Sequence, residues 1–362
     1  MSTPSVFPRT EEAQVPVAVP ARGPLRSLGG RDPIPLLALV VIGVIGSIVM
    51  IQVGGAYTGL TLSVGVGYGV VVVGMVLQLG YTHQLAFSQA MFMALGGYGV
   101  AILETKYGFS SAESVVCVIA ASAVVSLLIG SVLAGVPGLA LPLATLVLPL
   151  GLYVLATYSH YLGSYLGITG ILPLWSGGDY ASTAGRSGVV SVLFLAAAAG
   201  LVLRFIRSGV GLQLMSIATD EHLAQSIGVS LRQRRLEVFV VGSVLATIGG
   251  VIVATSQGIV SPDLVQESTE ITLLVTLYVA GSRSVVAVIC AALLIQYLST
   301  ANATISSNLP TIEGAVLVLV FLVEPNGVVG IVRRGWRAAT NRGLLPNRLP
   351  GVPARLPEGG AR

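Results

Sequence analysis

Long apolar runs separated by short polar connections dominate this chain. A helix that crosses the hydrocarbon core of a bilayer needs about 20 predominantly apolar residues. The hydropathy pattern predicts ten such spans, at about 34–53, 60–79, 85–104, 113–133, 138–158, 188–206, 236–256, 264–281, 284–303 and 310–331. The eighth run is short and begins with acidic residues, so we expect a short or re-entrant segment there. The pattern therefore predicts an all-α, polytopic membrane helix bundle.

The third run opens with an unusual polar stretch, "GYTHQLAFSQAMFMALGGYG", at positions 80–99. An amide in hydrocarbon is costly unless it is hydrogen-bonded. If the helix enters the bilayer near Leu85, Gln84 and Ser88 lie one helical turn apart. These polar groups then either line a translocation path or join neighbouring helices through hydrogen bonds. The candidate path residues are Gln84, Ser88, Gln89 and Phe92.

Small residues follow the same stretch and recur later in the chain. Glycines stand at 96, 97 and 99, and Ala246 and Gly250 have the small-x3-small spacing. Membrane helices approach closely where side chains are small, because dispersion holds them together. We expect tight helix crossings at these positions.

Composition and charge placement support a membrane protein. The chain is 54% hydrophobic and 9% charged, whereas a soluble domain carries about a quarter charged residues. The net charge of +4 does not indicate a nucleic-acid partner, because basic residues gather at the ends of apolar runs. With the N-terminus in the cytosol, the ten spans place 17 of the 19 Lys and Arg residues on the cytosolic side, as the positive-inside rule expects. We therefore predict a multi-pass plasma (inner) membrane protein with both termini cytosolic.

Three regions follow from this topology. Residues 1–33 and 333–362 are rich in Arg and Pro and are predicted to be disordered cytosolic ends. Residues 34–332 form the transmembrane domain, with a cytosolic loop at 207–235. Cys117 and Cys290 lie in apolar runs without metal or redox spacing, and we expect them to be buried as small hydrophobes.

The sequence lacks the motifs of an enzyme. The only lysine is Lys106, predicted to be outside, so no Walker A loop is present. The three histidines are scattered, and no charged residue lies near the middle of a predicted span. A charge there costs at least about 2.5–3.5 kcal/mol and usually marks an ion or proton site. We expect no catalytic residue and no metal, and a transporter that conducts passively or is driven by another subunit.

The cytosolic loop contains "TDEHLAQSIG", which has the pattern of a short capped helix. Thr219 or Asp220 can cap its N-terminus, and Gly228 can adopt the left-handed conformation after its end. The side chains of Leu223, Ala224 and Ile227 are predicted to share one face. Since a two-turn helix is not stable alone, it either lies on the protein's own cytosolic face or fits a groove on a partner.

This loop resembles the coupling loop of ABC-type permeases, whose motif reads EAA-x3-G. The stretch "RSGVGLQLMSIATDEHLAQSIGV", from position 207, is most similar to the branched-chain amino-acid branch. The third span, "VSPD" at 260–263 and "LVEPNGVVGI" near the end follow the same branch in order. The chain differs at His83 and Gln89, where the family usually has Gly and His, and in "AGSRS" at 280–284 and "GITGI" at 167–171.

The resemblance implies a permease subunit of an ATP-driven importer for branched-chain or other small amino acids or amides. Its implied partners are two cytosolic ABC ATPase subunits, a similar or identical second permease subunit, an extracytoplasmic substrate-binding protein and the lipid bilayer. ATP would be bound by the ATPases, so no cofactor is expected in this chain. The residues implied in ATPase coupling are Thr219, Asp220, Glu221, His222, Leu223, Ala224, Ile227 and Gly228. The alternative is an ATP-independent channel or facilitator for a small neutral solute.

Overall fold

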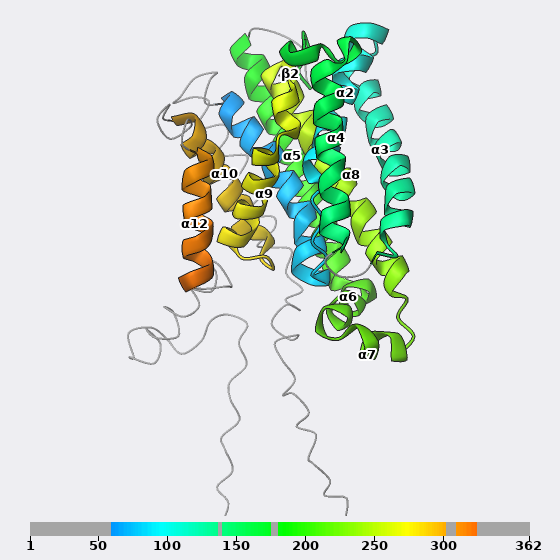
Figure 1. Ribbon diagram of the computed structural model, residues 1–362. Helices are drawn as coiled ribbons and strands as arrows, with labels where there is room; N and C mark the ends of the chain where they lie inside the picture. Colours follow the sequence, from blue (N-terminus) through cyan, green and yellow to red (C-terminus); the bar gives the residue numbers. More distant parts are fainter. Residues whose placement is uncertain (1–58, 137–139, 175–179, 302–308, 324–362) are drawn as a thin grey trace, which may run out of the picture. The chain divides into compact units, whose positions relative to one another are not determined.

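The computed structural model describes residues 59–136, 140–174, 180–301 and 309–323 (Figure 1). The predicted ends 1–33 and 333–362, and the first predicted span, lie outside these residues. The described part consists of helices apart from two strands of two residues each, β1 (Ile168–Thr169) and β2 (Ile259–Val260). This confirms the predicted all-α bundle.

The helices follow the predicted runs closely. In chain order they are Gly59–Tyr81, which ends in the π-helix η1 (Val76–Tyr81), then α2 (Gln89–Tyr107), α3 (Ser111–Leu133), α4 (Ala140–Tyr158), α5 (Tyr180–Arg207), α6 (Gly209–Thr219), α7 (Glu221–Ser226), α8 (Leu231–Gln257), α9 (Glu267–Ala280), α10 (Val285–Ala301) and α12 (Leu309–Val323). Short 3-10 turns are η2 (His160–Leu162), η3 (Ser164–Leu166) and η4 (Pro262–Val265). Within the described residues, five helices are long and apolar enough to cross a membrane: Gly59–Tyr81, Ser111–Leu133, Ala140–Tyr158, Ser187–Arg207 and Leu231–Gln257. The predicted eighth span is short, as expected, because α9 has 14 residues.

Connections predicted to share a membrane face lie together. The Arg283 side chain donates to the carbonyl of Gly80 at 3.1 Å, and Arg232 donates to the carbonyl of Ser131 at 3.1 Å. At the opposite end, β1 pairs antiparallel with β2. Figure 1 shows α6 and α7 at one end of the helices and β2 at the other. The connections thus lie at alternate ends of the helices, as the predicted membrane topology requires. The cytosolic orientation of the α6–α7 end stays a prediction.

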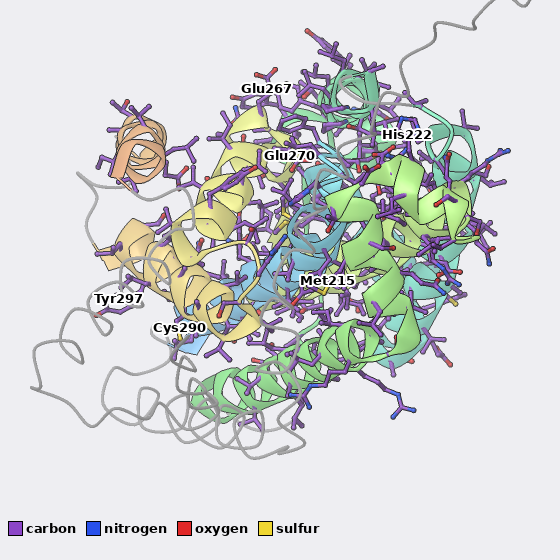
Figure 2. The ribbon with its side chains drawn as sticks, turned by 90° about the horizontal axis from the view of Figure 1, so that it is seen from below. Met215, His222, Glu267, Glu270, Cys290 and Tyr297 are labelled. Atoms are coloured by element: carbon purple, nitrogen blue, oxygen red, sulfur yellow. The ribbon has the colours of Figure 1, made fainter. Side chains whose placement is uncertain are left out.

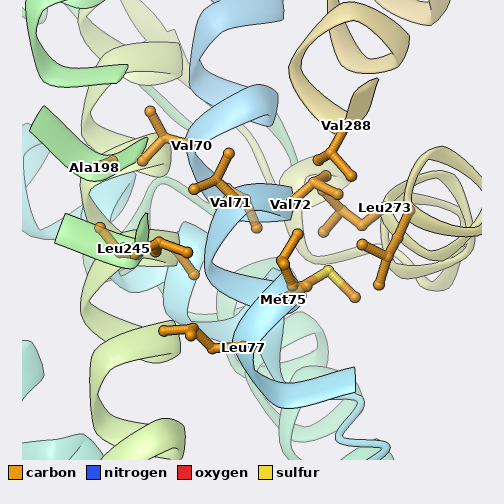
Figure 3. Close-up of a cluster of buried hydrophobic side chains, with 14 of the residues drawn as sticks. Val70, Val71, Val72, Met75, Leu77, Ala198, Leu245, Leu273 and Val288 are labelled. Atoms are coloured by element: carbon orange, nitrogen blue, oxygen red, sulfur yellow. The ribbon is translucent and has the colours of Figure 1, made fainter. Parts of the chain in front are cut away.

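The helix Gly59–Tyr81 lies in the centre of the packing. Val70, Val71 and Val72 are consecutive and fully buried, so this helix is apolar and enclosed on every side. Figure 3 shows their neighbours, which come from α5, α8, α9 and α10. By contrast, α3 and α4 expose most of their apolar surface. Outward faces of membrane helices remain apolar because they contact lipid.

Helices α2 and α8 cross at backbone contact. A Cβ atom added to Gly96 would lie 2.1 Å from the carbonyl oxygen of Thr247. One added to Gly250 would lie 1.8 Å from the carbonyl oxygen of Met93. The predicted close approach at these glycines is therefore confirmed, and only residues without a Cβ fit the crossing.

Helix α2 begins later than predicted. Residues 83–88 are not helical, and the helix starts at Gln89 instead of near Leu85. The chain turns back tightly after η1: the N–H of Gln84 donates to the carbonyl of Gln78 at 2.9 Å, and His83 has a positive φ of 51°. The expectation that Gln84 and Ser88 are neighbours on a helix is wrong, because both residues lie in the non-helical turn that precedes α2.

The predicted burial of the two cysteines is also wrong. Cys117 on α3 and Cys290 on α10 are both exposed. In a bilayer the outward face is as apolar as the interior, so an apolar neighbourhood in the sequence does not indicate burial.

Candidate functional site

A buried polar cluster lies where α2 begins. The structure places the four candidate path residues inside the bundle: Gln84 is 6% exposed, and Ser88, Gln89 and Phe92 are completely buried. Phe92 packs edge-to-face on Phe239 of α8, with ring centroids 5.8 Å apart. Their position agrees with a buried path, and their role in translocation stays a prediction.

Gln89 joins two helices. Its side-chain nitrogen donates to Oε1 of Gln78, in η1, at 2.6 Å. The Gln78 nitrogen donates in turn to the carbonyl of Phe239 at 3.5 Å, and Gly242 leaves space for the Gln78 amide. This bears out interhelical hydrogen bonding for Gln89. Gln78 was not among the predicted residues, although it is a lone amide at the end of an apolar run.

Glu270 on α9 completes the cluster and was also missed. The side chain is 3% exposed, and its Oε1 accepts the N–H of Ala90 in the first turn of α2 at 3.1 Å. The first N–H groups of a helix have no partner within it, and the helix dipole favours an anion there. Figure 2 shows Glu267 at the rim of the bundle and Glu270 further in. The sequence showed only an acidic start to the eighth run; its packing against α2 is tertiary.

Several oxygens of this cluster have no partner. Within the described residues, the buried side-chain atoms without a hydrogen bond include Gln84 Oε1, Ser88 Oγ, Gln89 Oε1 and Glu270 Oε2. A crevice of about 10 Å³ lies beside Gln84 and is lined by Met75, Gln78, Leu79, Gln84, Leu85, Ala86 and Leu274. Most buried polar atoms in proteins are hydrogen-bonded, so a group of unpaired oxygens at the start of α2 indicates a place where a water molecule or a ligand can bind.

The Gln78–Gln89 bond should contribute measurably to stability. Gln89→Leu leaves Gln78 Oε1 buried without a donor, which costs about 1–3 kcal/mol. We expect the double variant with Gln78→Leu to lose less than the sum of the single variants, since it removes both partners. Thermal unfolding of the four proteins in detergent measures this coupling, and strictly additive losses would contradict the bond.

The predicted cytosolic helix is formed by α7. Asp220 Oδ1 accepts the N–H groups of His222 at 2.8 Å and Leu223 at 3.1 Å, so Asp220 is the cap. Thr219 donates its hydroxyl to Met215 instead. Gly228 has the expected positive φ, 85°. Glu221 forms an ion pair with Arg235 of α8, which ties the start of α7 to the helix that follows.

Only part of the predicted apolar face of α7 is covered. Ala224 is buried and packs with Ile217 of α6 and Leu231 of α8. Leu223 and Ile227 are 60% and 67% exposed. We had predicted that these three side chains share one face. In the structure Ala224 packs against α6 and α8, whereas Leu223 and Ile227 stay exposed. Figure 2 views this end of the molecule and shows His222 and Met215 on it.

The cap should control the local order of α7. Asp220→Ala removes the acceptor for two N–H groups, which costs about 1 kcal/mol. We expect faster hydrogen exchange at His222 and Leu223, measured by mass spectrometry on the purified protein. Thr219→Ala is the control, because its hydroxyl does not cap α7. Equal exchange in the two variants would show that Asp220 does not hold this helix.

Comparison with known proteins agrees with this geometry. Residues 57–324 match the model of a family described as branched-chain amino acid transport system / permease component. A similar protein is the high-affinity branched-chain amino acid transport system permease protein LivM of Escherichia coli (strain K12), 25% identical over 145 residues, which are 40% of this chain and 34% of that protein. The match thus spans about a third of the length of this relative. No solved structure matches.

The family match extends over helices Gly59–Tyr81 to α12 and includes both the buried polar cluster and the α6–α7 segment. The match confirms the resemblance of the sequence motifs to the branched-chain amino-acid permeases. This chain belongs to the family of permease components of branched-chain amino acid transport systems.

Proposed function

We propose that this chain is the permease subunit of an ATP-driven ABC importer for branched-chain or other small amino acids or amides. An extracytoplasmic substrate-binding protein delivers the solute, and a similar or identical second permease subunit completes the membrane part. ATP is bound and hydrolysed by two cytosolic ATPase subunits. The observation that carries this proposal is the exposed apolar pair Leu223 and Ile227 on a capped, anchored helix.

The construction of α7 supports docking into a partner. Six residues of helix cannot persist alone in water, so its order comes from the Asp220 cap, the Arg235 ion pair and the burial of Ala224. These contacts hold one side of α7 against the protein and leave Leu223 and Ile227 outward. Amphipathic helices with such paired anchors bind in apolar grooves, here a groove on the ATPase.

The packing supports a route from α7 to the buried polar cluster. Leu231, the first residue of α8, packs with Ala224 of α7. Helix α8 then contacts the backbone of α2 at Gly96 and Gly250, which leaves no room for the two helices to slide independently. A displacement of α7 by the ATPase would move α8 and α2 together, and with them Ser88, Gln89 and Phe92. These residues, with Gln84, are the proposed translocation path.

The test is a crosslink through α7. Leu223→Cys, in a background with Cys117→Ser and Cys290→Ser, is expected to crosslink to a co-expressed ATPase partner, with a yield that changes between ATP and ADP. Tyr165→Cys is the control, because Tyr165 is 73% exposed at the opposite end of the bundle. If no position from 219 to 228 crosslinks while uptake continues without ATP, the chain is a passive channel or facilitator instead.

A further inference from the structure

The fully buried side-chain atoms of this cluster that have no hydrogen bond are all oxygens. The hydrogen bonds fix this chemistry for Gln89: the Gln78 nitrogen donates to the Phe239 carbonyl, so Gln78 offers its oxygen to the Gln89 nitrogen. Gln89 is therefore left with a free carbonyl oxygen. Gln84 contributes another carbonyl oxygen, and Ser88 a hydroxyl. The cluster thus offers acceptors that the protein itself does not use.

Glu270 adds a carboxyl group to this cluster. One of its carboxyl oxygens accepts the N–H of Ala90, and the other has no partner. The ion pairs of the described residues, Arg234–Glu237 and Arg235–Glu221, do not include it. A buried carboxylate without a cation is costly, and this cost is relieved either when the carboxyl is protonated or when a ligand brings a positive charge. The bond to Ala90 holds the carboxyl in place at the start of α2.

From this set of acceptors we infer that the cluster binds the protonated amino group of the transported solute, with Glu270 as its counter-ion. An ammonium has three N–H donors and no acceptor, which matches a set of carboxylate, amide and hydroxyl oxygens without donors of their own near the start of α2. Charge-assisted bonds of this type are about twice as strong as neutral ones. Of these side chains, Gln84 also lines the small crevice, together with Gln78 and Leu274. Leu274 lies one helical turn after Glu270. The inference rests on the proposed function and narrows its solutes to those with a free amine.

Two other buried carboxyls supply matched controls. Glu313 of α12 accepts the hydroxyl of Thr272 at 2.7 Å, on another side of α9. Glu104, near the far end of α2, accepts the N–H of Leu172 at 2.7 Å. Both are buried like Glu270, but neither lies at the start of α2. A loss that is general to buried carboxyls would appear in Glu313→Gln and Glu104→Gln as well.

The experiment measures occupation of the crevice in the complete transporter in proteoliposomes. The labelled position is Leu85→Cys, in the background with Cys117→Ser and Cys290→Ser, since Leu85 lines the crevice. Labelling by a small thiol reagent is followed with L-leucine and with 4-methylpentanoate, which is leucine without its amine. We expect leucine to slow labelling and 4-methylpentanoate to have no effect. Glu270→Gln should raise the leucine concentration needed for protection at least about tenfold, while Glu313→Gln and Glu104→Gln leave it unchanged.

Several outcomes would overturn the inference. These are equal protection by the two compounds, no protection by leucine, or unchanged protection in Glu270→Gln. Protection by Na⁺ alone, compared with choline, would assign the oxygens to a metal cation instead. If Glu270→Gln does not fold, the comparison of leucine with 4-methylpentanoate in the protein that retains Glu270 still tests whether the site recognises the amine. ATP-dependent uptake is measured in parallel. If it is present, the proposed importer function stands even when the amine site is refuted. If it is absent, the proposed importer function is itself refuted.

Discussion

Gly250→Ala is expected to prevent the transmembrane bundle from folding into a stable structure. The added Cβ would lie 1.8 Å from the carbonyl oxygen of Met93, where an ordinary C···O contact needs about 3.3 Å. The obstacle is backbone, so no side-chain rotation relieves it, and α2 and α8 would have to separate. Overpacking usually costs about 1–3 kcal/mol, occasionally more, and we expect the upper end or beyond, a large part of a typical folding free energy.

The matched control is Gly151→Ala in α4, because nothing lies within 4 Å of its added Cβ. Size-exclusion profiles and melting temperatures in detergent compare the two variants. We expect aggregation or a strongly lowered melting temperature for Gly250→Ala and none of this for Gly151→Ala. Similar melting temperatures would contradict the close α2–α8 crossing.

Leu223→Asp is expected to uncouple the permease from the proposed ATPase partner. The Leu223 side chain is 60% exposed on α7, and the proposed groove on the ATPase would bury it. The substitution therefore places a charge in that apolar interface. Central interface side chains of this kind contribute about 2 kcal/mol or more, which corresponds to roughly 30-fold weaker association. We expect at least a tenfold loss of ATP-driven uptake and loss of the ATPase during co-purification.

The control is Leu223→Met, which retains an apolar side chain of similar volume. The Leu223→Met variant should retain both ATP-driven uptake and co-purification with the ATPase. The melting temperature of the isolated permease should be the same in both variants, because Leu223 does not lie in its core. Normal uptake by Leu223→Asp would show that this face of α7 does not bind the ATPase.

The candidate site was only partly accessible to sequence reasoning. Gln84, Ser88 and Gln89 stood out because polar residues at the start of an apolar run are costly where they face lipid, and all three lie inside the bundle. Gln78 and Glu270 were missed as members of the site. They lie 11 and 181 residues from Gln89 along the chain, and the contacts that bring them to α2 leave no local pattern.

The sequence by itself determined the helical membrane fold, most helix positions and the place and end of α7, with its cap narrowed to Thr219 or Asp220. These depend on hydrophobic length and on contacts within a few residues, such as those of Asp220 and Gly228. Only the tertiary structure decided which faces are inside. In lipid, both faces of a helix are apolar, so Cys117 could not be assigned to the outside or Glu270 to the start of α2 before the helices were packed together.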